Sequence, residues 1–164
     1  MTAQKAQVRG AKVAQRFTAL RRAADWDPGA SRPILAMLRA DGRVTVALDQ
    51  ALAPAGLSLP RFNVLMELAA SWPDGLPLHE LGRRLVKSPP NMTALVDGLE
   101  SERLARRTRI RADRRVVVAQ ITERGWEVLA AATPGLFAAE KRIVGGLSPA
   151  EREAVAGLLD RLRS

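Results

Sequence analysis

The segment from Leu78 to Ile121 constrains the fold of this 164-residue chain more than any other part of its sequence. Helical spacing of apolar residues predicts a short helix over about 78–86 and a second over about 89–102. They are joined by the tight connection Val86-Lys87-Ser88, and Ser88 followed by proline is typical of a helix start. Two helices connected in this way form a helix-turn-helix. The buried stripe of the second helix is predicted to contain Met92, Leu95, Val96 and Leu99.

Two β patterns follow the second helix directly. Residues 104–110 alternate, with arginines on one face, and residues 116–121 are rich in β-branched side chains. Residues 111–115 link the two patterns, so we expect a β-hairpin. The sequence therefore predicts a mainly α-helical fold in which a small hairpin, the wing, stands beside the helix-turn-helix.

Positive charge is concentrated in the same part of the chain. The formal net charge is +9, and residues 76–124 alone carry eleven positive and six negative side chains. The thirteen residues 103–115 contain seven arginines and one acidic residue, Asp113. Charge of this density repels itself unless a polyanion binds, and nucleic acid is a stronger candidate than an anionic membrane. A merely solvated basic face is the alternative interpretation.

The second helix of a helix-turn-helix usually lies in the DNA major groove, with its first residues against the base edges. Asn91 can pair with adenine, and the methyl groups of Thr93 and Ala94 can contact thymine. Asp97 would serve only as a cytosine reader or a spacer. The alternative is that these are ordinary surface residues of a helix.

At the tip of the hairpin, Asp113 and Arg115 are two residues apart and lie on one side of the chain. An ion pair between them would stiffen the arginine, which suits the negative potential of a narrow minor groove. Alternatively, Asp113 is a plain turn residue. The candidate DNA contacts are Ser88, Pro90, Asn91, Thr93, Ala94, Arg106, Arg107, Arg109, Arg111, Asp113, Arg114 and Arg115.

Turn-forming residues divide the rest of the N-terminal half. A narrow amphipathic pattern over 11–24 precedes Asp27-Pro28-Gly29 and Pro33, which indicate a linker. Residues 31–53 fit either a helix or a turn and a strand, and local rules do not decide between them. A short buried helix then runs from about residue 59 to the break at 73–75.

Two helical patterns complete the chain. Thr122 can cap a helix that extends to about Val144, and Pro134 should kink it. Residues 148–151, Ser-Pro-Ala-Glu, form a capping box for the last helix. A winged helix needs neither apolar helix, so we expect this pair to pack against a second subunit.

The composition argues against several classes of function. The chain has no Cys, and its one histidine, His79, cannot form a His-rich metal site. It has no Gly-rich phosphate loop and no carboxylate pair beside a plausible base, so we expect neither an enzyme nor a cofactor or metal. No apolar run reaches the length of a membrane span, and we expect a cytoplasmic protein.

Four stretches together resemble the MarR (multiple antibiotic resistance regulator) family of winged-helix transcription factors, over roughly residues 31–163. They are Leu78-His79-Glu80-Leu81, residues 88–100, Asp113-Arg114-Arg115 and residues 121–125, Ile-Thr-Glu-Arg-Gly. The resemblance implies a homodimer held by the first and last helices, a helix that reads the major groove, and Arg115 in the minor groove. It implies a helix over 31–53 and repression relieved by a small, often aromatic, ligand.

On this basis we expect a basic N-terminal extension (1–30), a first dimerisation helix (31–60), a winged helix-turn-helix lobe (61–122) and C-terminal dimerisation helices (123–164). The chain departs from the family at Ala94 and Gly98, where arginine is frequent. It also departs at Arg103, where glycine is usual, so this position needs a positive φ or a different cap. A ligand between the dimer helices and the lobe would contact Met37, Met66, Trp72 and Trp126, although such residues are more often plain core.

The sequence therefore predicts a homodimeric, sequence-specific DNA-binding transcriptional regulator, a repressor that a small ligand releases. The main alternative is an architectural protein that coats DNA through charge alone. A large preference for one DNA site over others would separate the two.

Overall fold

The computed structural model describes residues 15–16, 18–22, 24, 27–109 and 117–162. The chain divides into two compact units, residues 1–42 and residues 43–164. Helix α2 (Pro28–Leu52) begins in the first unit and ends in the second.

The predicted linker at 27–33 is wrong, because a helix runs through it. The Gly29 amide donates to Asp27 Oδ1 at 2.7 Å, and the Ser31 amide donates to the Asp27 carbonyl at 3.1 Å. Asp27 therefore caps a helix whose first residue is Pro28, a position that tolerates proline well. Pro33 lies inside α2, where it removes one helical hydrogen bond. The helix also resolves the ambiguous stretch 31–53, as the family resemblance implied.

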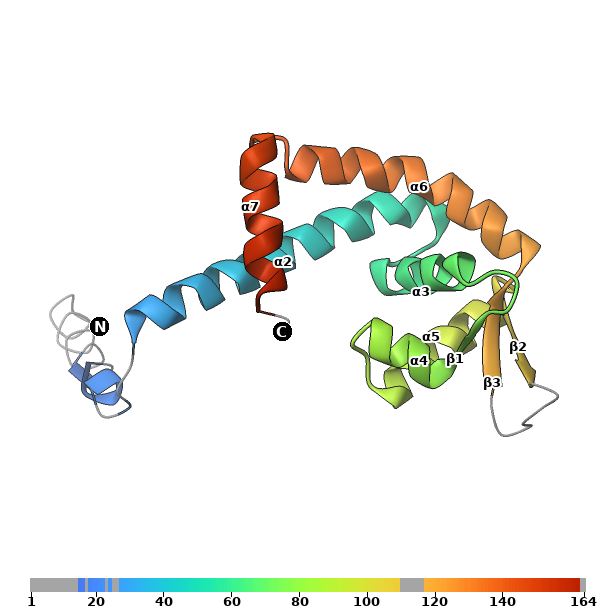
Figure 1. Ribbon diagram of the computed structural model, residues 1–164, viewed down its shortest axis with the longest axis horizontal. Coiled ribbons are helices and arrows are strands. Elements are labelled where there is room, and N and C mark those ends of the chain that lie inside the picture. The colour runs from blue at the N-terminus through green and yellow to red at the C-terminus, as the bar shows by residue number, and fades with distance from the viewer. Residues whose placement is uncertain (1–14, 17, 23, 25–26, 110–116, 163–164) are drawn as a thin grey trace, which may run out of the picture. The chain divides into compact units, whose positions relative to one another are not determined.

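The second unit contains a mainly helical fold with a small antiparallel sheet, as predicted (Figure 1). A 3-10 turn (η1, Ala53–Ala55) follows α2. The remaining elements are α3 (Leu59–Ala70), β1 (Leu76–Pro77), α4 (Leu78–Arg84), α5 (Pro89–Ser101), β2 (Ala105–Arg109), β3 (Val117–Ile121), α6 (Glu123–Ile143) and α7 (Pro149–Asp160).

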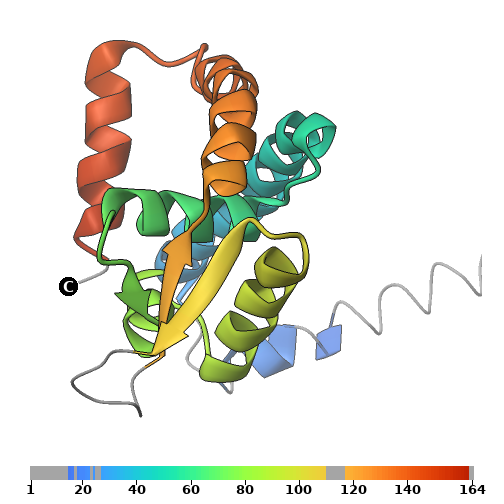
Figure 2. The ribbon, with the colours of Figure 1, turned by 90° about the vertical axis from the view of Figure 1, so that its right-hand side faces the viewer.

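The sheet has one strand more than the predicted hairpin. Figure 2 shows β3 between β1 and β2, in the order β1-β3-β2. Leu76 of β1 lies opposite Ala119, which also lies opposite Arg107 of β2. A Cβ at Gly75 would stand 2.2 Å from the Ala119 carbonyl oxygen, and its φ is +71°. Only glycine therefore allows the chain to enter β1 this close to the sheet.

The core of this unit lies where α3, α4, α5, the sheet and the first half of α6 meet. Leu65, Leu68, Leu81, Val96 and Leu99 have no exposed surface. Burying an aliphatic side chain of this size contributes roughly 1.5–3 kcal/mol. The face of α5 that carries Met92, Val96 and Leu99 is thus fixed, and this sets which face remains outside.

The helix ends follow the predicted caps, with one exception. Thr122 Oγ1 accepts a hydrogen bond from the Gly125 amide at 3.0 Å, and Ser148 forms the capping box with Glu151. Arg103 has a φ of +61°, as expected for a residue in the place of the usual glycine. Ser88 occupies the predicted N-cap of α5, but its side chain makes no capping hydrogen bond.

Candidate nucleic-acid interface

Helix α5 has a buried face and an exposed face. Met92, Val96 and Leu99 point into the core, and α3, α4 and β2 pack around them. Helical geometry therefore turns the intervening residues outward. Ser88, Pro90, Asn91, Thr93 and Ala94 are all exposed, so each predicted contact on this helix is accessible to a partner.

The connection between α4 and α5 turns sharply at Val86. This residue has a φ of +51°, which is rare for a β-branched residue, and 88% of its surface is exposed. The Lys87 amide donates to the Gly82 carbonyl at 2.8 Å, and a Cβ at Gly82 would stand 3.1 Å from the Lys87 oxygen. The missing side chain at Gly82 therefore lets the turn fold back onto α4.

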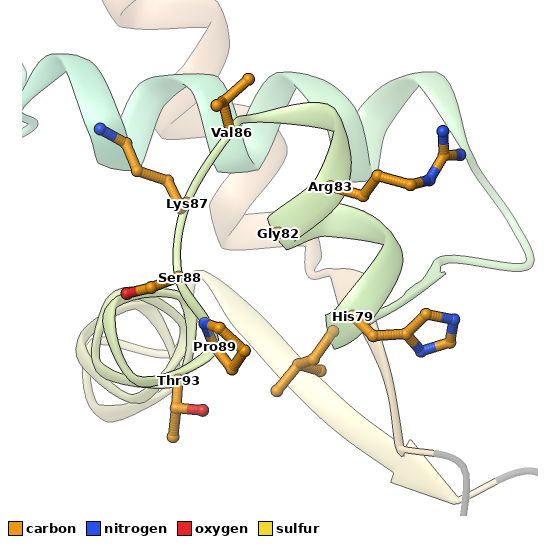
Figure 3. Close-up of a pocket in the computed structure, with 9 residues that line it drawn as sticks. His79, Gly82, Arg83, Val86, Lys87, Ser88, Pro89 and Thr93 are labelled. Carbon is orange, nitrogen blue, oxygen red and sulfur yellow. The ribbon is translucent and has the colours of Figure 1, made fainter.

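A hollow of about 580 Å³ lies between α4 and the start of α5. Figure 3 shows that the side chains of His79 and Arg83 point away from α5. The polar groups around the hollow do not converge on one point, unlike those of a small-molecule site. Its walls are formed by Leu78, His79, Gly82, Arg83, Val86, Lys87, Ser88, Pro89 and Thr93.

In strand β2, the neighbouring residues Arg106 and Arg107 have different partners. The exposed Arg106 donates from Nε to Gln120 Oε1 at 3.1 Å. Gln120 Nε2 in turn donates to the carbonyl of Pro73 at 3.0 Å. Arg106 is therefore held at the surface by a chain of hydrogen bonds that ends in the loop before β1.

Arg107 is turned toward α5 and is only partly exposed. Its Nη1 forms an ion pair with Asp97 and another with Glu100 Oε2, at 2.9 Å in the second case. Its Nη2 donates to the Thr93 carbonyl at 3.3 Å. Arg107, which the sequence predicted as a DNA contact, is therefore bound to helix α5, and Asp97 is one of its partners there.

Of the remaining predicted contacts, Arg109 is the last residue of β2. Arg111, Asp113, Arg114 and Arg115 lie outside the described residues. Glu100 and Gln120 were not singled out from the sequence. Glu100 could have been, because it lies three residues after Asp97 on the same side of a helix.

Three further ion pairs, formed by Arg84 and Arg61, stabilise the scaffold around α5. Arg84 contacts Glu80 at 2.7 Å and Glu67 at 3.1 Å, which joins α4 to α3. The hydrogen bond from Arg84 lowers the pKa of Glu80, and the same bond raises the pKa of Arg84. Arg61 Nη2 lies 2.6 Å from Glu102 Oε2, and this contact lowers the pKa of Glu102.

A shallower groove of about 410 Å³ runs between α3 and α5. Ala94 and Gly98 leave room there, and Arg61 and Lys87 supply positive charge. The remaining lining residues are Pro60, Asn91 and Leu95.

The four predicted ligand contacts lie in different parts of the chain. Met37 lies on α2 in the first unit and is partly buried. In the second unit, Met66 on α3 and Trp72 after it are exposed. The rings of Trp72 and Trp126 meet edge to face with their centroids 6.5 Å apart. The structure therefore brings two of the four together.

The described residues contain neither a metal-binding cluster nor a membrane-spanning helix. Within them, no His, Cys, Asp or Glu side chains gather in a group of three or more able to bind a metal ion. None of the helices in that part of the chain has the length and apolar character to cross a membrane.

This arrangement, a helix-turn-helix followed by a β2–β3 wing, defines a winged helix-turn-helix protein. A model described as "MarR family" matches residues 55–116. The HTH-type transcriptional regulator MhqR of Bacillus subtilis (strain 168) is 34% identical over 86 residues, which cover 52% of this chain and 59% of MhqR.

Solved structures match over a longer stretch. The transcriptional repressor CouR, bound to a 23-mer DNA duplex, is 31% identical with a TM-score of 0.73, over 79% of this chain and 90% of that one. CouR from Rhodococcus jostii RHA1, bound to p-coumaroyl-CoA, is 29% identical with a TM-score of 0.69, over 84% and 94%. The chain belongs to the MarR family.

Proposed function

We propose that this chain is a cytoplasmic, homodimeric transcriptional regulator that binds specific DNA sites and acts as a repressor released by a small ligand. The observation that carries the proposal is the geometry of α5. One face is locked into the core by Val96 and Leu99, and the opposite face presents Asn91, Thr93 and Ala94. A helix held this firmly can place its side chains against base edges reproducibly.

Two relatives support DNA binding as the activity. CouR carries a DNA duplex in its solved structure, and MhqR is named as an HTH-type transcriptional regulator. In our proposal, α5 enters the major groove while Arg106 on the adjacent wing contacts the phosphate backbone. Phosphate contacts set the register, and base contacts supply the sequence preference.

The proposed homodimer rests on the last helix. Val155, Leu158, Leu159 and Leu162 lie at helical spacing in the C-terminal segment, and all four are exposed in the single chain. An apolar stripe of this kind is typical of a subunit interface. Replacing Leu158 by Lys should shift the chain from dimer to monomer in sedimentation equilibrium, and a Leu158→Lys variant that remains dimeric would exclude α7 from the interface.

The proposed ligand is small and aromatic. CouR binds p-coumaroyl-CoA, which carries an aromatic ring. In this chain, Trp72 and Trp126 form an aromatic pair, and Trp72 is about half exposed. A ligand that packs against this pair would alter tryptophan fluorescence, which gives a direct screen for effectors.

One observation favours a second function, an architectural protein that coats DNA without reading its sequence. Helix α5 contains no arginine or lysine, and Ala94 and Gly98 occupy positions where long basic side chains could have made contacts. Binding would then depend on charge elsewhere, and the affinity would fall steeply with salt for every sequence.

Titration onto two labelled duplexes tests the two functions against each other. One duplex is the DNA upstream of the chain's own gene, and the other is a shuffled duplex of equal length, both at about 150 mM salt. A regulator should prefer its site by about 10³-fold or more. Equal affinities would overturn the proposed function, and a steep salt dependence would then support the architectural protein.

A further inference from the structure

Arg107 connects the wing to the recognition helix through both its backbone and its side chain. Strand β2 is at the edge of the sheet, so alternate amides have no partner strand. The Arg107 amide donates instead to Glu100 Oε1 at 2.9 Å. The guanidinium reaches Glu100 Oε2, Asp97 and the Thr93 carbonyl. These contacts span two turns of α5, from residue 93 to residue 100.

The charge of this cluster argues against a direct role in binding phosphate. Only 22% of the Arg107 side chain is exposed, and two carboxylates accompany its single positive charge. The cluster carries one net negative charge beside the proposed DNA-binding face. By Coulomb's law alone, Asp97 and Glu100 oppose DNA binding, so any favourable effect they have must come from geometry.

We propose that Arg107 is a positioning residue, which with Asp97 and Glu100 fixes the orientation of α5 relative to the wing. This inference rests on the proposed function, since it assigns the three residues a part in DNA recognition. Thr93 is a candidate base contact, and Arg107 holds its carbonyl. In this arrangement, the two acidic residues influence sequence discrimination through Arg107 and the orientation of α5, and not through a contact of their own with DNA.

Glu100→Gln tests the proposal because charge and geometry predict opposite results. The substitution keeps the size of the side chain and removes one negative charge. Loss of hydrogen bonds to a charged group should lower affinity for the specific duplex about tenfold or more. Affinity for the shuffled duplex should stay the same or rise. Unchanged or tighter binding to the specific duplex would overturn the proposal.

The ratio of the two affinities, measured on one preparation, is independent of the fraction of inactive protein. Asp74→Asn is the matched control: it removes one acid from the same unit at a residue outside the cluster, and it should leave the ratio unchanged. Arg107→Lys is a second variant that keeps the positive charge but loses the two-pronged geometry. Arg107→Lys should lower the ratio of the specific to the shuffled affinity without changing the salt dependence of either. An Arg107→Lys variant with the wild-type ratio would contradict the positioning role.

The wild-type chain separates the two possible failures. Equal wild-type affinities for both duplexes would overturn the proposed function and this inference with it. A wild-type preference that Glu100→Gln preserves would overturn the positioning role alone.

Discussion

Helices α5 and α7 begin with the same sequence pattern, but their apolar stripes differ in burial. Each starts with proline after a serine N-cap, and each carries an apolar stripe at helical spacing. In α5, Met92, Val96 and Leu99 are at most 1% exposed, whereas Leu158 and Leu159 in α7 are 60% and 43% exposed. Local sequence therefore forms both helices, and only contact with other elements decides whether a stripe becomes core.

This difference assigns the two helices different roles in our account. Packing on three sides fixes α5, so its outer face can recognise DNA in a defined orientation. Among the described residues, nothing buries the stripe of α7 to a comparable degree, and we propose that a second copy covers it.

Truncation of one leucine in α5 and one in α7 should give the largest difference in the free energy of unfolding. Leu99→Ala removes a fully buried side chain and should cost about 2–5 kcal/mol in the free energy of unfolding. Leu158→Ala should cost little in the isolated chain, because most of that side chain is exposed. Urea denaturation at low protein concentration measures both, and equal losses would break the comparison.

Substitution of one glycine in α6 and one in α7 should change the free energy of unfolding by smaller amounts, with opposite signs. A Cβ at Gly125, at the start of α6, would stand 2.1 Å from the Leu104 carbonyl oxygen. Gly125→Ala should therefore destabilise the chain by roughly 1–3 kcal/mol. A Cβ at Gly157 in α7 meets nothing within 4 Å, so Gly157→Ala should stabilise by about 0.5–1 kcal/mol. Thermal unfolding followed by circular dichroism checks both signs.

Acid should remove two small stabilising contributions, one at each helix. Arg61 lowers the pKa of Glu102 at the end of α5, and the Ser148 backbone and hydroxyl lower the pKa of Glu151 in α7. A lowered pKa in the folded state means that the stabilisation is present above the ordinary value of 4.5. It is lost as the pH falls through the folded-state pKa.

Glu102→Gln and Glu151→Gln should thus both be less stable than wild type at pH 7. At a pH below the folded-state pKa values, the difference from wild type should vanish. Urea denaturation at both pH values measures this, and a difference that persists in acid would show that the lost contact is not ionic.

The sequence predicted the contacts that lie within a few residues and missed most of those that join separate elements. The caps at Thr122 and Ser148 depend on the next three residues, and both were confirmed. Strand β1 has two residues, and its pairing with Ala119 spans more than forty positions, so no local pattern signals it.

The arginines of β2 illustrate the same limit. The alternating pattern of the strand predicts that Arg107 contacts DNA together with the neighbouring arginines. Its carboxylate partners lie seven and ten residues earlier in a different element, and only the packing of α5 on β2 brings them together. Near the other end of the chain, the pattern Asp27-Pro28-Gly29 is typical of a break, but the Asp27 side chain caps a helix that begins at Pro28.

The central claim, that the outer face of α5 recognises a DNA sequence, is tested most directly by Asn91→Ala. The Asn91 side chain is exposed, so the variant should fold normally. Its affinity for the specific duplex, measured by titration at fixed salt, should fall by about 1–3 kcal/mol, and its affinity for the shuffled duplex should not change. Equal affinity of Asn91→Ala and wild type for the specific duplex would contradict the claim.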